Sequence, residues 1–180
     1  MQSVDQIIKE ALKGGADHAV PITPDQVVVD ERVRLKCQVP ICDAYNQSLM
    51  CPPNVLSVDE FKNLLSMYSE AILIQVKARG CSEEEIIAAE LHVQNLISDL
   101  ETKALMQGNY FIAGFGAAQC RLCPKCVGVK SGESCRHPFR ARPSMEAVGI
   151  NVYKTCDNAG VPFKPLDKKN LCFAGLLLIN

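Results

Sequence analysis

Four cysteines are crowded into the stretch CRLCPKCVGVKSGESC, which runs from Cys120 to Cys135. Three of them, Cys120, Cys123 and Cys126, recur at an interval of three residues. This spacing puts three thiolates on one tight backbone curl, whose amide groups can point inward at the sulfurs. Each iron of an inorganic cluster needs one thiolate, so the spacing is typical of an iron–sulfur site.

Cys135 is the predicted fourth ligand of the same site. In bacterial ferredoxins the fourth cysteine of such a run typically comes three residues later, precedes a proline and binds the other cluster. The gap after Cys126 is longer here, so Cys135 can close the same cluster. Between positions 121 and 142 the one acid, Glu133, faces six cations, which would stabilise an anionic four-iron cluster. These cations are Arg121, Lys125, Lys130, Arg136, Arg140 and Arg142.

A tetrathiolate zinc site is the alternative for this loop, because zinc takes four thiolates and tolerates paired C-x2-C spacing. Three consecutive cysteines at one interval exceed the paired pattern of a zinc knuckle, which favours iron–sulfur. The nearby cations distinguish the two kinds of site less well, because a Zn(Cys)4 site is anionic too. His137 is a further possible zinc ligand, but Pro138 restrains it, and we interpret it as a surface group or a neighbour of the ligands.

A second group, Cys37, Cys42 and Cys51, lies in CQVPICDAYNQSLMCPP and has no fourth cysteine nearby. Three thiolates around four irons would leave one iron open to substrate or solvent, as catalytic metal sites do. The alternatives are a closed structural site or partly buried thiols. A fourth ligand could come from one of the remaining cysteines or from a non-cysteine group, or there could be none. Free cysteine is commonly buried as a small apolar residue, so we interpret the remaining cysteines as non-ligands, with Cys156 the favoured exception. The remaining cysteines are Cys81, Cys156 and Cys172.

Periodic segments on either side must position these loops. Capping boxes at Ser57 with Glu60 and at Ser82 with Glu85 predict two helix starts. Ser144 is a third predicted helix cap. The expected helices cover residues 3–12, the segment after Ser57, roughly 83–107, and 145–160. The expected strands cover 70–78, 109–120 and 171–180, and the Val27–Val29 run with Val33 and Leu35 predicts extended chain leading into Cys37.

The alternation of strands and helices over the last part of the chain predicts an α/β fold, in which helices cover one sheet. We expect a single domain, 1–180, that carries two inserted cysteine-rich metal-binding segments, 37–51 and 120–135. The length suffices for a sizeable core, and no repeat or low-complexity tract stands out.

Composition limits the setting of the protein. The net charge of −1 gives no bias toward nucleic acid or membrane, and no apolar run is long enough to span a bilayer. The first residues, MQSVDQIIKEALKGG, do not have the pattern of a signal peptide. We therefore expect a cytoplasmic protein, whose thiols stay reduced and are available to a metal.

Several motifs together resemble a family of cysteine-rich predicted metal-binding proteins of unknown function. They are CDAYNQSLMCPPN, CRLCPKC with the later CRHP, and RPSMEAVGINV. The resemblance covers the chain from about Cys37 to the end, and the family is found largely in anaerobic bacteria and archaea. It implies metal or iron–sulfur binding by the seven cysteines of the two segments but no reaction.

The function predicted from these observations is that of an iron–sulfur protein with one or two [4Fe-4S] clusters, serving as an electron-transfer accessory with a redox protein partner. One alternative is an enzyme that uses an open cluster iron, and the other is a zinc-stabilised interaction module. Walker, G-x-S-x-G and dinucleotide-binding motifs are missing from the sequence. Nucleic-acid binding is not expected, since Phe139 is the one aromatic in the basic loop.

Overall fold

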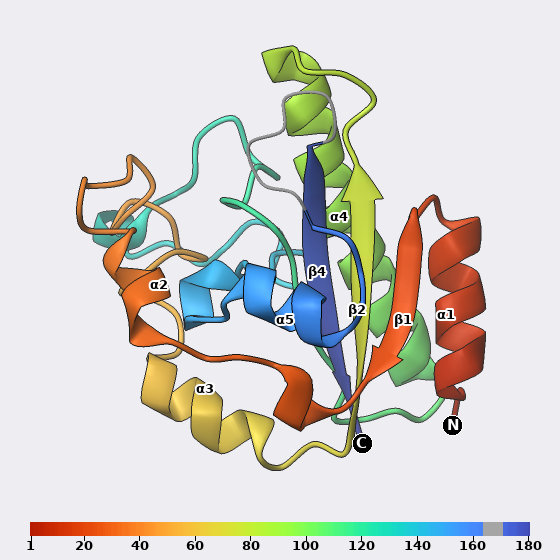
Figure 1. Cartoon of the computed structure of the whole chain (residues 1–180). Coiled ribbons are helices and arrows are strands. Elements are labelled where there is room, and N and C mark those ends of the chain that lie inside the picture. The colour runs from red at the N-terminus through yellow and green to blue at the C-terminus, as the bar shows by residue number, and fades with distance from the viewer. Residues whose placement is uncertain (164–170) are drawn as a thin grey trace.

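A four-stranded antiparallel sheet forms the centre of the fold, with the strand order β1-β2-β4-β3 (Figure 1). The computed structural model describes residues 1–163 and 171–180. The strands are β1 (His18–Ile22), β2 (Glu70–Lys77), β3 (Ala113–Phe115) and β4 (Cys172–Ile179). Helices cover both faces of the sheet, so the predicted α/β class is confirmed.

The central pair, β2 and β4, runs in unbroken register from Glu70 opposite Ile179 to Lys77 opposite Cys172. The six inner residues of β2 are all buried, because both faces of the sheet are covered. Ile72 and Ile74 point to one layer of the core, and Leu73 to the other. This is why β2 has a continuous apolar run rather than an alternating pattern.

One face of the sheet is covered by α1 (Val4–Lys13) and α4 (Glu83–Met106). Ser3 caps α1, and Ser82 caps α4 in the predicted capping box. Ile7 of α1 and Ile97 of α4 are fully buried against the sheet. The helices predicted for 3–12 and 83–107 are therefore confirmed, each to within a residue at either end.

The other face carries α3 (Val58–Leu65), the 3-10 turn η3 (Glu146–Val148) and α5 (Val152–Asn158). Phe61 of α3 meets Phe115 of β3 edge to face, with ring centroids 5.1 Å apart. The short helix α2 (Glu31–Leu35) packs beside η3 and leads into Cys37. This face therefore places the entry to the first cysteine segment against the chain around residue 146.

The extended chain expected over residues 27–35 is wrong for its second half, which forms α2. Asp30 starts this helix by accepting a hydrogen bond from the Arg32 amide at 2.9 Å. The alternation of Val33 and Leu35 resembles a strand, but the local cap determines the conformation here. Strand β1 was not predicted from the sequence, because it is a short edge strand that contains Pro21.

Two other elements are shorter than predicted. The strand expected over 109–120 is limited to β3, because a turn closed by the Ile112 amide on Asn109 precedes it and Gly116 pairs with Pro143. The helix expected over 145–160 breaks at Gly149, whose φ is +90°. Ser144 does accept a hydrogen bond from the Ala147 amide at 3.1 Å, but Asn151 caps the second piece, α5.

The two cysteine-rich segments extend from the same side of the sheet, next to α2 (Figure 1). Residues 37–56 contain turns and bends but no helix, as predicted, and residues 116–128 contain bends but no helix. Across residues 1–163 and 171–180, no helix combines the length and the apolar character that a membrane span requires.

Candidate metal centre

The cysteines of the second group lie close together in the structure. Cys120, Cys123, Cys126 and Cys135 line one small cavity together with Leu49 and Met50 of the first segment and other neighbours. None of these four cysteines forms a disulfide. Burial raises the pKa of the Cys120 thiol, and the three neighbouring thiols raise it further. Four thiols that share one cavity can serve as one ligand set.

Backbone amides point at the sulfurs of this group. The His137 amide donates to Sγ of Cys135 at 3.4 Å, and the Leu122 amide acts on Cys120. His137 itself is exposed and contributes its backbone rather than its ring. Such N–H donors stabilise thiolate charge, which is the arrangement expected around metal-bound sulfur.

Several hydrogen-bond donors surround the sulfur of Cys126. Burial acts to raise the pKa of this thiol, but its hydrogen-bond donors outweigh burial and lower it below the ordinary value. The donors are the amides of Leu49 and Gly128 and the side chain of Ser48, with Arg136 adding a positive charge. Ser48 and Leu49 belong to the first cysteine segment, so this segment supplies hydrogen bonds to the second.

The thiols of the first group, Cys37, Cys42 and Cys51, lie near enough to one another to interact electrostatically. Burial raises the pKa of Cys51 to about 11; the Ser48 hydroxyl acts in the opposite direction, and the thiols of Cys42, Cys37 and Cys120 raise it further. The pKa of Cys37 is raised by burial and then by Cys42. Cys51 is buried while Cys42 is exposed, so the group extends from the interior to the surface.

The two groups are in contact through Ser48. Its buried hydroxyl is hydrogen-bonded to Cys51 in one group and to Cys126 in the other. Cys51 also lies near enough to Cys120 for the two thiols to interact electrostatically. Sequence reasoning missed Ser48, because only the meeting of two loops distant in the chain gives it a role.

A cavity of about 590 Å³ lies beside the second group. Its walls combine the two cysteine segments with the start of α4, where Ile87 and Leu91 contribute. Cys120, Cys123 and Cys126 form part of the lining, and Lys125 and Lys130 add positive charge. This volume is in the range of small-molecule sites, and a ligand bound there would lie against the thiols.

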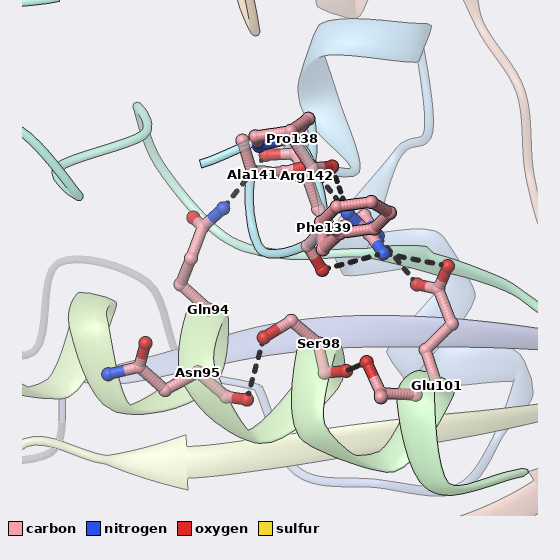
Figure 2. A network of polar contacts seen from close by, with 9 residues as sticks. Gln94, Asn95, Ser98, Glu101, Pro138, Phe139, Ala141 and Arg142 are labelled. Atoms are coloured by element: carbon pink, nitrogen blue, oxygen red, sulfur yellow. Dashed lines mark hydrogen bonds and ion pairs between the residues drawn. The ribbon is translucent and has the colours of Figure 1, made fainter. Parts of the chain in front are cut away.

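The cations of the loop are used differently from the sequence-based expectation. Arg121 pairs with Glu90 at 2.7 Å, and Arg142 pairs with Glu101 at 2.7 Å. Both acids lie on α4, so these two arginines attach the loop to the helix (Figure 2 shows the second pair). Arg136 is the loop cation that acts on a ligand thiol, Cys126.

The three remaining cysteines lie elsewhere. Cys81 is exposed between β2 and α4. Cys156 is buried in the core of the α5 layer, where burial and then Cys172 and Glu146 raise its pKa to about 12. Cys156 is thus buried as a small apolar residue of the core.

A family model described as "Predicted metal-binding protein (DUF2284)" matches residues 20–179. The chain belongs to this family. The matched range includes all ten cysteines of the sequence. No curated protein and no solved structure matches the chain significantly. Membership therefore agrees with the predicted metal binding, and the family description names neither the metal nor a reaction.

The thiols of the second group are the candidate ligands of this DUF2284 protein. Cys120, Cys123, Cys126 and Cys135 share a cavity, and N–H donors are directed at Cys126 and Cys135. Thiolates are ligands both of zinc and of iron–sulfur clusters. In the part of the chain that the structure describes, no three His, Cys, Asp or Glu side chains converge closely enough to hold one metal ion.

Proposed function

We propose that this protein is an iron–sulfur electron carrier, with a [4Fe-4S] cluster on the Cys120 to Cys135 group and a second cluster on the Cys37 to Cys51 group. The observation that carries the proposal is the single cavity lined by four thiols, three of which accept hydrogen bonds from backbone amides. When bound, such clusters accept and release one electron at a time.

The hydrogen-bond donors support a redox role in particular. A donor directed at a cluster sulfur stabilises the more negative, reduced state, and so sets the reduction potential. Cys126 receives three such donors. A purely structural zinc site needs no adjustment of this kind, because zinc does not change its oxidation state.

The first cysteine group offers a route by which an electron would reach a redox partner. Cys42 is exposed, and the neighbouring side chains of Val39 and Ile41 are 65% and 72% exposed. An electron could therefore leave through the first group to a redox protein docked over these side chains. The contact of Ser48 with both groups would keep the two clusters close to each other.

A second candidate function is catalysis at the cavity of about 590 Å³. Lys125 and Lys130 favour an anionic small molecule there, and Cys123 and Cys126 would bring it next to the cluster. Electron paramagnetic resonance of the reduced protein separates the two functions. An enzyme changes its cluster signal when its substrate is added, whereas a carrier keeps the same signal with small anions.

Iron and sulfide analysis after anaerobic purification tests the proposal. We expect about eight irons and eight sulfides per chain, the content of two four-iron clusters. Cys123→Ser should remove about four of each, whereas Cys81→Ser, at an exposed cysteine outside both groups, should remove none. Colourless protein with stoichiometric zinc and no sulfide would overturn the proposal in favour of the zinc module.

A further inference from the structure

An aromatic side chain is exposed to solvent close to the second cysteine group. The side chain of Phe139 is 84% exposed, and Phe139 follows Cys135, one of the thiols of this group, by four residues. Aromatic residues are enriched at protein interfaces, although a single exposed apolar side chain is common on any surface. The backbone and the charges around Phe139 therefore decide whether it marks a docking site.

The backbone around Phe139 is a tight turn. The amides of Arg140 and Ala141 both donate to the His137 carbonyl, at 3.0 and 2.8 Å. Pro138 and Phe139 therefore lie at the tip of the turn, and proline fixes its own φ angle. The Phe139 ring is thus presented by a backbone with little conformational freedom.

Arg142 attaches this turn to α4. Its guanidinium donates to the carbonyls of Phe139 and Ala141, at 3.3 and 2.8 Å, and it also donates to the Glu101 carboxylate on α4 (Figure 2). Both side chains of this ion pair are mostly buried. A contact that is held in place before binding loses little conformational entropy when a partner docks, and Phe139 meets this condition.

Positive charge is concentrated around the turn. Residues 121–142 hold six cations and one acid, in a chain whose net charge is −1. Arg121 and Arg142 are neutralised by acids of α4. The other four cations are exposed, and none of them forms an ion pair with a residue in 1–163 or 171–180: they are Lys125, Lys130, Arg136 and Arg140.

These four cations lie beside the thiols and the turn. Arg136 lines the thiol cavity and donates to the Lys125 carbonyl at 3.0 Å. Arg140 donates to an amide side chain of α4 at 2.8 Å. Lys125 and Lys130 line the cavity of about 590 Å³, where Asp43 is the one acid. An acidic molecule that approaches the second cysteine group from this side therefore meets mainly positive charge.

Phe139 and these four cations form a surface, called the Phe139 surface, that combines an apolar contact with positive charge. We propose that it is the docking site of a small acidic redox protein, which gives one electron to the cluster of the second group. The partner is oxidised and the cluster is reduced in that step. This inference rests on the proposed electron-transfer function, and adds the charge of the electron donor and the place where it docks. Opposite charges steer the two proteins together, and the Phe139 ring supplies the apolar contact.

Two probes test the proposal, an acidic ferredoxin and an acidic flavodoxin, which share negative charge but not the cofactor. The anaerobically purified, metal-loaded protein is titrated with each probe by calorimetry, at low salt and at about 0.15 M salt. Charges more than about 8 Å apart are largely screened at the higher salt. We expect both probes to bind at low salt, and the affinity to fall about tenfold at the higher salt.

Two kinds of variant separate the apolar contact from the charges. Phe139→Ala should weaken binding about tenfold at either salt. Lys130→Gln combined with Arg140→Gln should instead reduce the salt dependence, because two of the charges are gone. Phe111→Ala is the matched aromatic control, at a side chain that is 72% exposed just before β3, and Lys13→Gln is the charge control, at an exposed lysine of α1. Both controls should bind like the wild-type protein.

Equal affinities for Phe139→Ala and Phe111→Ala, or failure of both probes to bind the wild-type protein at low salt, would overturn the docking site. A short single-stranded oligonucleotide that binds more tightly than either probe, and also depends on Phe139, would overturn it in favour of nucleic acid. Iron and sulfide analysis of the same samples tests the proposed function separately. Protein without clusters that still binds the probes through Phe139 would overturn the electron carrier but support the docking site.

Discussion

Ser48 is a residue that contacts both cysteine groups. Its hydroxyl has one hydrogen and is hydrogen-bonded to Cys51 and to Cys126, so it donates to one sulfur at a time. Removing the hydroxyl therefore takes a hydrogen-bond donor from whichever of the two sulfurs accepts its hydrogen. The potential of a cluster depends on such donors, so Ser48 should adjust both sites although it binds no metal.

We predict that Ser48→Ala lowers the reduction potential of at least one cluster while leaving the iron content unchanged. A net hydrogen bond of about 1 kcal/mol corresponds to about 40 mV for a one-electron couple. Redox titration followed by electron paramagnetic resonance measures the shift. Ser66→Ala is the matched control, because its hydroxyl donates to the Asn63 carbonyl and lies outside both groups. Equal potentials in both variants would contradict the role given to Ser48.

The sequence indicated which cysteines lie together better than it indicated what surrounds them. The spacing of Cys120, Cys123 and Cys126 is local, and a single backbone curl turns it directly into a shared cavity. Ser48 carries no such local signal. Its role arises from contacts between segments that are distant in the chain, and a single sequence does not encode those contacts as spacing.

The long helix α4 is the element that holds the second cysteine segment in place. Arg142 donates two hydrogen bonds to the Glu101 carboxylate, at 2.7 and 3.0 Å, and both side chains are mostly buried. The Gln94 side chain donates to the Arg142 carbonyl at 2.9 Å (Figure 2). The polar face of α4 therefore anchors the chain just after Cys135, which determines where the loop ends.

Arg142→Gln should destabilise the protein by about 3 kcal/mol, because it leaves the Glu101 carboxylate mostly buried without its partner. Urea unfolding of the metal-loaded protein measures the change. Arg140→Gln is the control, since exposed Arg140 makes a single bond to Asn95 at 2.8 Å. Its cost should stay below about 1 kcal/mol. Equal costs for the two variants would show that α4 does not anchor the loop through Glu101.

Gly149 separates η3 from α5 and brings the chain close to α3. Its φ of +90° disfavours any side chain, and a Cβ there would lie 2.8 Å from Cγ2 of Val58. Gly149→Ala should therefore cost about 2–4 kcal/mol, which combines the backbone conformation with overpacking. Gly160→Ala shares the positive φ but meets nothing within 4 Å, so it isolates the backbone part. Thermal unfolding of the pair gives the difference, and equal losses would exclude the clash with Val58.

Elements with strong local signals were predicted, and those decided by tertiary contacts were not. The capping boxes at Ser57 and Ser82 marked the starts of α3 and α4 correctly, because a cap is formed by neighbouring residues. The break at Gly149 was missed, since residues 145–160 have a helical pattern on both sides of it. The packing of the chain against Val58 requires the break, and that contact is absent from any local pattern.

At the scale of the molecule, the sheet and its helices bring two separate cysteine segments to one side. The first follows α2 and the second follows β3, with β2 and α4 between them in the chain. Alternating strands and helices predicted an α/β fold but gave no strand order. The adjacency of the two segments depends on that order and on the contact of Ser48 and Leu49 with Cys126.

This adjacency predicts that the two proposed clusters interact magnetically. Cys51 of one group lies near Cys120 of the other, so the unpaired spins of two reduced clusters should be close enough to split or broaden each other's signals. Electron paramagnetic resonance of the fully reduced protein should show this broadening. Cys51→Ser should remove the iron of the first site alone and leave a simple, narrow signal from the second. The same should hold in reverse for Cys123→Ser. A simple sum of two independent signals in the wild-type protein would contradict the adjacency, whereas loss of iron from both sites in Cys51→Ser would indicate that the second cluster assembles only on a complete first site.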